Sequence, residues 1–130
     1  MRFNQIKETC LYVKDLKQTS GFYKGKLGLD QFSYVEGSHV FFRVGTSVLL
    51  CFLNDKTKEQ GTLPPHYGVG QLHFAFEIDP EAYVACRQKL IELGIAVEHE
   101  EEWEGGFKSF YFRDPDGHLA EVVEKGMWEV

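Results

Sequence analysis

The chain carries the same order of predicted elements twice, and this repeat limits its possible folds more than any other feature. In each half, a β-rich segment is followed by a helix with one apolar face and then by three short strands separated by turns. The halves span residues 5–53 and 71–125, and the polar, Gly- and Pro-rich residues 54–70 predict a linker between them. The sequence therefore predicts two β-α-β-β-β modules within a single domain of residues 1–130.

Turn residues and helix-ending residues set the boundaries of these elements. Gly28 and Gly94 are expected to end the two helices, and Asp79 followed by Pro80 is typical of a helix start. In the first module we expect a strand at 5–13, a helix at 16–27 and strands at 31–35, 39–44 and 47–53. In the second module we expect a strand at 71–78, the helix, and strands at 95–99, 107–113 and 119–124.

The composition supports a folded protein of the α+β class. Apolar residues make up 43% of the chain and aromatic residues 15%, which excludes an intrinsically disordered protein. Each module is expected to form a curved four-stranded sheet with one helix on its back. Two such modules would form a cupped mixed sheet that encloses a cavity for a small molecule.

Charge and cysteine content restrict the partners and the compartment. With 14 Lys and Arg against 20 Asp and Glu, the net charge is −6, which argues against a nucleic-acid or membrane partner. No apolar run approaches the length of about 18 residues that a spanning helix needs, and secretion is not expected from the residues that follow Met1. Cys10, Cys51 and Cys86 have no close pairing. They are expected to be reduced thiols in a cytoplasmic protein.

Three side chains that can bind a metal lie in predicted strands. Glu8 and His73 lie in the first strands of the two modules, and Glu121 lies in the last strand between Ala120 and Val122. An unpaired charge among apolar side chains is costly, so a shared divalent cation would offset the burial of all three. Two simpler interpretations stay open: Glu8 as an edge-strand carboxylate facing solvent, and His73 as a hydrogen-bonded core histidine.

The other polar motifs predict structure rather than chemistry. Residues 114–117 (DPDG) predict a tight turn, and His118 is expected to follow that turn into solvent. The three glutamates at 100–102 are typical of a solvated turn. Cys10 and Cys51 lack a cationic neighbour that would activate a thiol, so they are expected to pack in the core. The remaining histidines are expected at the surface: His39, His66 and His99.

Four segments form a recognisable series along the chain. They are residues 8–16 (ETCLYVKDL), 22–29 (FYKGKLGL), 72–76 (LHFAF) and 109–121 (SFYFRDPDGHLAE). In this order and spacing they resemble the vicinal oxygen chelate superfamily, which contains glyoxalase I, extradiol dioxygenases, fosfomycin-resistance enzymes and bleomycin-binding proteins. The resemblance covers about residues 5 to 125.

The resemblance implies a ligand set position by position. The metal ligands of the superfamily fall on Glu8, His73 and Glu121, and the fourth ligand that glyoxalase I commonly has falls on Leu50. Leucine cannot bind a metal, so the resemblance favours the three-ligand branch. The implied cofactor is one divalent cation among Mn, Fe, Ni, Co and Zn, with positions left open for the paired oxygens of a substrate. Glu8 is also the candidate catalytic base, if it leaves the metal.

The resemblance further implies a metal-dependent enzyme that is lyase-, transferase- or dioxygenase-like and acts on a small oxygen-rich molecule. It also implies a homodimer with sites at or near the subunit interface. Whether the modules pair within one chain or between the two chains stays open. One alternative is a non-catalytic protein that sequesters an antibiotic or another small molecule, as bleomycin-resistance proteins do. Another is a protein of the same cupped fold whose metal site is vestigial.

Overall fold

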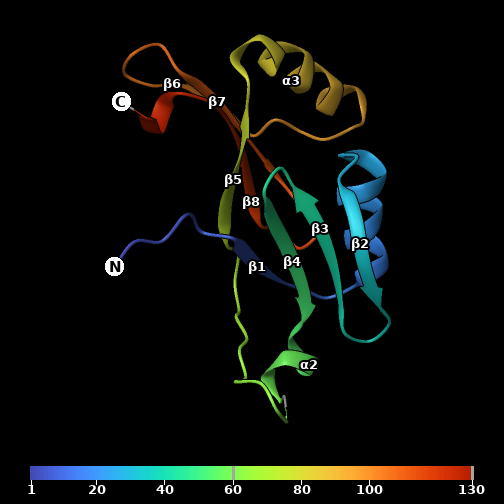
Figure 1. Cartoon of the computed structure of the whole chain (residues 1–130). Helices are drawn as coiled ribbons and strands as arrows, with labels where there is room; N and C mark the ends of the chain where they lie inside the picture. The colour runs from blue at the N-terminus through green and yellow to red at the C-terminus, as the bar shows by residue number, and fades with distance from the viewer. Residues whose placement is uncertain (60, 130) are drawn as a thin grey trace. The chain divides into compact units, whose positions relative to one another are not determined.

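The computed structural model describes residues 1–59 and 61–129, which form two compact units. The first unit comprises Met1–Gly70 and the second Gln71–Val130, drawn from blue to green and from yellow to red in Figure 1. Each unit contains a mixed four-stranded sheet and a helix between its first and second strands. The predicted α+β class and the repeated order of elements are thereby confirmed.

The first unit folds as a sheet whose edge strands are joined by a helical segment. Its elements are β1 (Glu8–Val13), α1 (Leu16–Ser20), η1 (Gly21–Lys26), β2 (Asp30–Val35), β3 (His39–Val44), β4 (Ser47–Leu53) and α2 (Asn54–Lys58). The strand order is β1-β4-β3-β2, with β1 parallel to β4 and the other pairs antiparallel. Helix α2 occupies the start of the segment that the sequence predicts as a linker.

The helix predicted at 16–27 forms over nearly that range, but it widens after its first turns. The carboxylate of Asp15 accepts a hydrogen bond from the N–H of Gln18 (3.1 Å) and so caps α1. In η1 the bonds span five residues, as in the bond from the N–H of Leu27 to the carbonyl of Phe22 (3.0 Å). The helix buries Tyr23, whose ring lies 5.5 Å from that of Phe42 on β3.

The second unit repeats this topology. Its elements are β5 (His73–Ile78), η2 (Pro80–Ala82), α3 (Tyr83–Glu92), β6 (His99–Glu102), β7 (Lys108–Arg113), β8 (Leu119–Glu124) and η3 (Met127–Glu129). The strand order is β5-β8-β7-β6, and β5 runs parallel to β8. Asp79 stands before η2 as predicted, but its side chain makes no capping hydrogen bond.

Strand β6 lies four residues later than the sequence predicts. It covers residues 99–102, so the glutamates at 100–102 form a strand and the prediction of a solvated turn is wrong. Glu102 stands opposite Lys108 on β7, and Glu100 forms an ion pair with Arg87 on α3. An edge strand keeps one side in solvent, so it accommodates charges that a central strand would exclude.

Each sheet has one face against its helix and one face turned away from it. The helix-facing side chains are the most buried in the chain, for example Val40 and Phe42 in the first unit and Phe110 and Phe112 in the second. Burying one such side chain stabilises a fold by about 1.5–3 kcal/mol. Along β5 the opposite face is exposed, because every second side chain from His73 onward is solvent-accessible. Among the described residues, no helix is long and apolar enough to cross a membrane.

Candidate metal centre

The second unit brings two of the three predicted ligands together. On the parallel pair β5 and β8, His73 stands beside Leu119 and Ala75 beside Glu121, so His73 and Glu121 are diagonal neighbours on the same sheet face. Their nearest polar atoms, His73 Nε2 and Glu121 Oε1, are 3.3 Å apart. The side chain of Glu121 is only 9% exposed, whereas that of His73 is 50% exposed.

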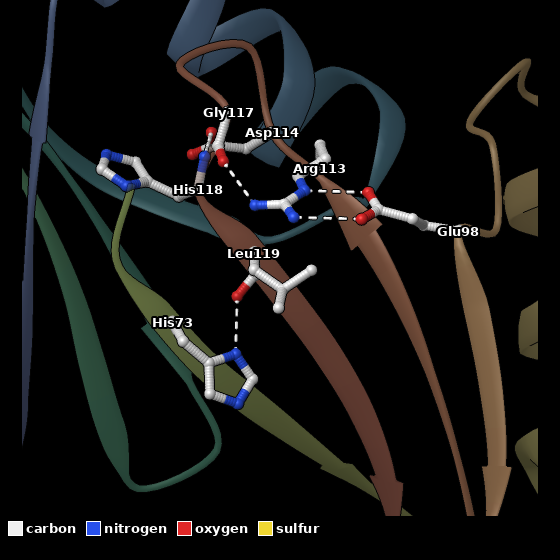
Figure 2. A network of polar contacts seen from close by, with 7 residues as sticks. All are labelled: His73, Glu98, Arg113, Asp114, Gly117, His118 and Leu119. Atoms are coloured by element: carbon white, nitrogen blue, oxygen red, sulfur yellow. Dashed lines mark hydrogen bonds and ion pairs between the residues drawn. The ribbon is translucent and has the colours of Figure 1, made fainter. Parts of the chain in front are cut away.

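The orientation of the His73 ring is set by the backbone of β8. His73 Nδ1 lies 2.9 Å from the carbonyl oxygen of Leu119, as Figure 2 shows. A carbonyl oxygen only accepts, so Nδ1 carries the proton and the lone pair of the neutral ring lies at Nε2. Metal-binding histidines are commonly held in this way, by a backbone carbonyl on the ring nitrogen that does not bind the metal.

Tyr111 on β7 also lies at this site, whereas the sequence alone leaves open whether its ring packs in the core or lines a cavity. It stands opposite Glu121 in the β7–β8 register, and its ring centroid is 6.1 Å from that of His73. Burial raises the pKa of Tyr111, and the Glu121 carboxylate contributes in the same direction. The phenol therefore keeps its proton at neutral pH and remains a hydrogen-bond donor. Strand alternation could have placed Tyr111 on this face, but not beside Glu121.

Glu8 lies in the first unit, exposed at the start of β1. It shares a sheet face with Cys10, since alternate residues of a strand point to the same side. Burial raises the pKa of the Cys10 thiol, and the charge of Glu8 adds to that effect. Leu50 on β4 pairs with Cys10 and so lies on the face that carries Glu8. The approach of Glu8 to His73 and Glu121 stays a prediction.

The described part of the chain, residues 1–59 and 61–129, contains no group of three or more His, Cys, Asp or Glu side chains arranged to hold a metal ion. The second unit supplies a pair of candidate ligands, an imidazole and a carboxylate. These donor types suit the later first-row divalent metals and zinc.

The sequence predicts that His118 follows the turn into solvent, and this prediction is wrong. The side chain of His118 is buried, with only 2% of its surface exposed. The predicted turn itself is present, with the N–H of Gly117 bonded to the carbonyl of Asp114 (2.9 Å). The ring of His118 folds inward because its Nδ1 accepts a hydrogen bond from the N–H of Leu72 (2.9 Å). The partly buried N–H of Leu72 is satisfied by this bond, and no local turn pattern reveals a partner that lies 46 residues away.

Aromatic rings cover the Glu8 face of the first sheet. The ring of His39 stacks on Phe41 at 3.8 Å, and Phe41 packs edge-on against Phe52 at 5.2 Å. The ring of His66 lies 5.0 Å from that of Phe52, and its Nδ1 is 2.8 Å from the hydroxyl of Tyr12. His39 and His66 are therefore half-buried rather than fully at the surface, while His99 is exposed as predicted. Burial lowers the pKa of His39.

Comparison with known proteins shows the family and the fold to which the chain is similar. Residues 4–122 match the family model described as the Glyoxalase/Bleomycin resistance protein/Dioxygenase superfamily. A crystal structure of lactoylglutathione lyase from Agrobacterium tumefaciens is 35% identical, with a TM-score of 0.94 and 100% coverage of both chains. Glutathione transferase FosA of Serratia marcescens is 28% identical over 122 residues, which are 90% of this chain and 78% of FosA. Metallothiol transferase FosB of Shouchella clausii is 44% identical over 54 residues, 38% of this chain and 36% of FosB.

Proposed function

The chain belongs to the glyoxalase/bleomycin resistance protein/dioxygenase superfamily, and on that basis we propose that it is a divalent-metal-dependent enzyme. The observation that carries this proposal is the 3.3 Å separation of His73 Nε2 and Glu121 Oε1. Since Leu119 holds the His73 proton at Nδ1, two acceptor atoms face each other. Only a positive charge between them, a metal ion or a proton, makes this arrangement favourable.

We assign His73, Glu121 and Glu8 as the three ligands. One imidazole and two carboxylates neutralise the charge of a dication and leave it open positions. A bound dication would supply Lewis-acid chemistry toward a substrate with two neighbouring oxygens. Within the second unit, Glu121 is held in place by its burial and His73 by Leu119, so both donors are oriented before any ion binds.

Glu8 also acts as the base in this proposal. Its exposed carboxylate accepts the proton that the substrate or an attacking thiol gives up. Tyr111, protonated at neutral pH, donates a hydrogen bond at the same site and keeps the Glu121 carboxylate oriented.

The reaction proposed is a lyase reaction or a thiol transfer on a small oxygen-rich substrate. The names of the three relatives all refer to glutathione or to a thiol, and one of those proteins is 35% identical over its whole length. Leu50, which cannot bind a metal, takes the position on the Glu8 face where a fourth ligand would stand, so the site proposed has three ligands. The working form proposed is a homodimer.

A second function is favoured by the aromatic face of the first unit. The stacked rings of His39 and Phe41, with Phe52 beside them, suit a planar ligand held by stacking. A protein that sequesters such a ligand needs no metal, so metal content separates the two functions.

The test is the metal content of protein purified without added ions. We expect about one dication per chain in the wild type, and loss of that ion in His73→Ala and in Glu121→Ala. The matched control is His99→Ala, because His99 forms an exposed pair with Glu101 (2.8 Å) on β6. A metal-free wild type that takes up no added Zn²⁺ or Co²⁺ would contradict the proposal, and binding of an aromatic ligand by that protein would favour sequestration.

A further inference from the structure

The hairpin between β7 and β8 is stabilised by hydrogen bonds among its own turn residues. The carboxylate of Asp114 accepts hydrogen bonds from the N–H groups of Asp116 (3.0 Å) and His118 (2.8 Å). The N–H of Asp114 donates in turn to the carbonyl of His118 (3.0 Å). Asp114 and His118 are both buried, so the bond from the N–H of His118 to the Asp114 carboxylate is shielded from solvent and holds the start of β8 in a defined position.

The same hairpin is also held by the side chain of Arg113, which binds Glu98 just before β6. The guanidinium of Arg113 donates from Nη1 to the carbonyl of Gly117 (3.0 Å). From Nε and Nη2 it donates to the two carboxylate oxygens of Glu98 (2.8 and 3.0 Å), the forked arrangement visible in Figure 2. This pairing lowers the pKa of Glu98, so the fork persists at neutral pH.

This hairpin holds the residues that precede His73. The side chain of Gln71 packs so closely over Gly117 that a Cβ at Gly117 would stand 2.5 Å from its Nε2. The N–H of Leu72 donates to His118 Nδ1 (2.9 Å), and the carbonyl of Leu72 accepts from the N–H of Leu119 (2.8 Å). Leu72 is thus bound at both its polar backbone groups, one residue before the candidate ligand.

The chain of contacts ends on the His73 ring. The carbonyl of Leu119, the residue after His118, accepts from His73 Nδ1 (2.9 Å). His118 therefore acts on His73 by two routes: through the backbone of Leu72, and through the placement of the Leu119 carbonyl. Because Nδ1 of His118 is the acceptor, the bond requires a ring nitrogen without a proton, which a leucine of similar size lacks.

We propose that His118 is a positioning residue of the candidate metal centre, whose buried imidazole fixes both the place and the tautomer of the His73 ring. The metal-binding part of this inference rests on the proposed function. The positioning part does not, because it concerns the protein without metal.

A matched pair of variants isolates the hydrogen bond. Asn and Leu are similar in size, and the amide oxygen of Asn stands close to the position of Nδ1. His118→Asn therefore keeps an acceptor for Leu72, while His118→Leu removes it with a similar loss of ring volume. Leu90→Ala, in the buried face of α3, is the control for general loss of stability in the same unit.

Two measurements are made on each full-length protein. In metal-free protein, the ¹⁵N shifts of the His73 ring report the tautomer, and we expect protonation at Nδ1 in the wild type, in His118→Asn and in Leu90→Ala. In His118→Leu we expect a mixture of tautomers. Co²⁺ binding is then titrated and followed by visible absorption. We expect the affinity of His118→Leu to be about 10- to 100-fold weaker, which is the range for losing a residue that supports a metal ligand. We expect near wild-type affinity in His118→Asn and in Leu90→Ala.

The outcomes are distinguishable. A wild-type tautomer and wild-type Co²⁺ affinity in His118→Leu would overturn the inference. Equal loss in His118→Asn and His118→Leu would also overturn it, by assigning the effect to ring volume. If the wild type binds no Co²⁺ but only His118→Leu loses the tautomer, the positioning role stands and the proposed metal function fails.

Discussion

At the scale of the residue, the second unit places a buried carboxylate next to a histidine nitrogen that also accepts hydrogen bonds when the ring is neutral. Glu121 is buried on a sheet face beside a histidine whose proton points elsewhere, toward Leu119. Local strand propensity does not favour a buried carboxylate at that position. The arrangement is favourable only with a positive charge between the two acceptors, either a metal ion or a proton, and the proposed function takes the metal ion.

Glu8→Gln separates the two roles proposed for Glu8. An amide oxygen still binds a metal but cannot take up a proton, so we expect the metal to be retained and turnover to fall by about 100-fold or more, the usual contribution of a general base. Metal analysis and an activity assay on the same preparation check this. Equal loss of metal and turnover would mean that Glu8 acts only as a ligand.

Tyr83 offers a prediction about stability that is independent of the site. Among the described residues its hydroxyl is buried without a hydrogen-bond partner, and the pKa of Tyr83 is raised to about 12, chiefly by burial. Tyr83→Phe removes an unsatisfied polar group, so we expect the free energy of unfolding at pH 7 to rise by about 1 kcal/mol.

The same variant changes the pH dependence. The unfolded tyrosine ionises near pH 10, whereas the folded one holds its proton to about pH 12, so the wild type loses stability as pH rises through this window. Tyr83→Phe lacks this loss. Urea unfolding at pH 7 and pH 10.5 measures both effects, and a parallel decline in the two proteins between these pH values would contradict the prediction.

At the scale of the element, loops and turns decide where the strands place their side chains. The hairpin that ends in His118 sets the start of β5 as well as the start of β8, although these segments are far apart along the chain. The edge strand β6 is built largely from glutamates, of which Glu102 stands opposite Lys108 and Glu100 forms an ion pair with Arg87. Neither outcome follows from the local pattern of apolar residues.

Gly117→Ala tests the contact between this hairpin and β5. Gly117 and Gly94 have nearly the same positive φ, 82° and 81°, but only Gly117 has a neighbour, Gln71, within 4 Å of its missing Cβ. Gly94→Ala is therefore a matched control for backbone strain, which costs about 1–2 kcal/mol. We expect only a slightly larger loss in Gly117→Ala, measured by urea unfolding, because the flexible end of the Gln71 side chain must move aside. Equal losses would show that the contact contributes nothing.

At the scale of the whole molecule, the proposed ligands divide between the two units. Glu8 belongs to the first unit, and His73 and Glu121 belong to the second. A site that uses all three requires a first unit and a second unit to meet, either within one chain or between two copies of the chain. The sequence resemblance leaves both arrangements open.

Mixing two inactive variants distinguishes these arrangements. If sites form between subunits, a heterodimer of Glu8→Ala and His73→Ala chains contains one intact site and one site with both changes. Random exchange should then restore metal to about a quarter of all sites. Metal analysis after refolding the mixture checks this, with each variant refolded alone as the control. No restoration in confirmed heterodimers would place each site within one chain.

The repeated order of strands and helices was predictable because it rests on local periodicity. Alternation along β1 and β5 placed Glu8 and His73 on the faces turned away from the helices, and Gly28 and Gly94 ended the helices as expected. The candidate ligands could be identified from the sequence for the same reason, because a carboxylate between apolar neighbours is unusual in a strand.

Long-range pairing decided the rest. The distance between His73 and Glu121 depends on the β5–β8 register, and the burial of His118 depends on one N–H in Leu72. Tyr111 joined the site through its partner on the adjacent strand. Hydrogen bonds between segments that are distant along the chain leave no periodic trace in the sequence, so only the folded arrangement reveals which polar groups meet.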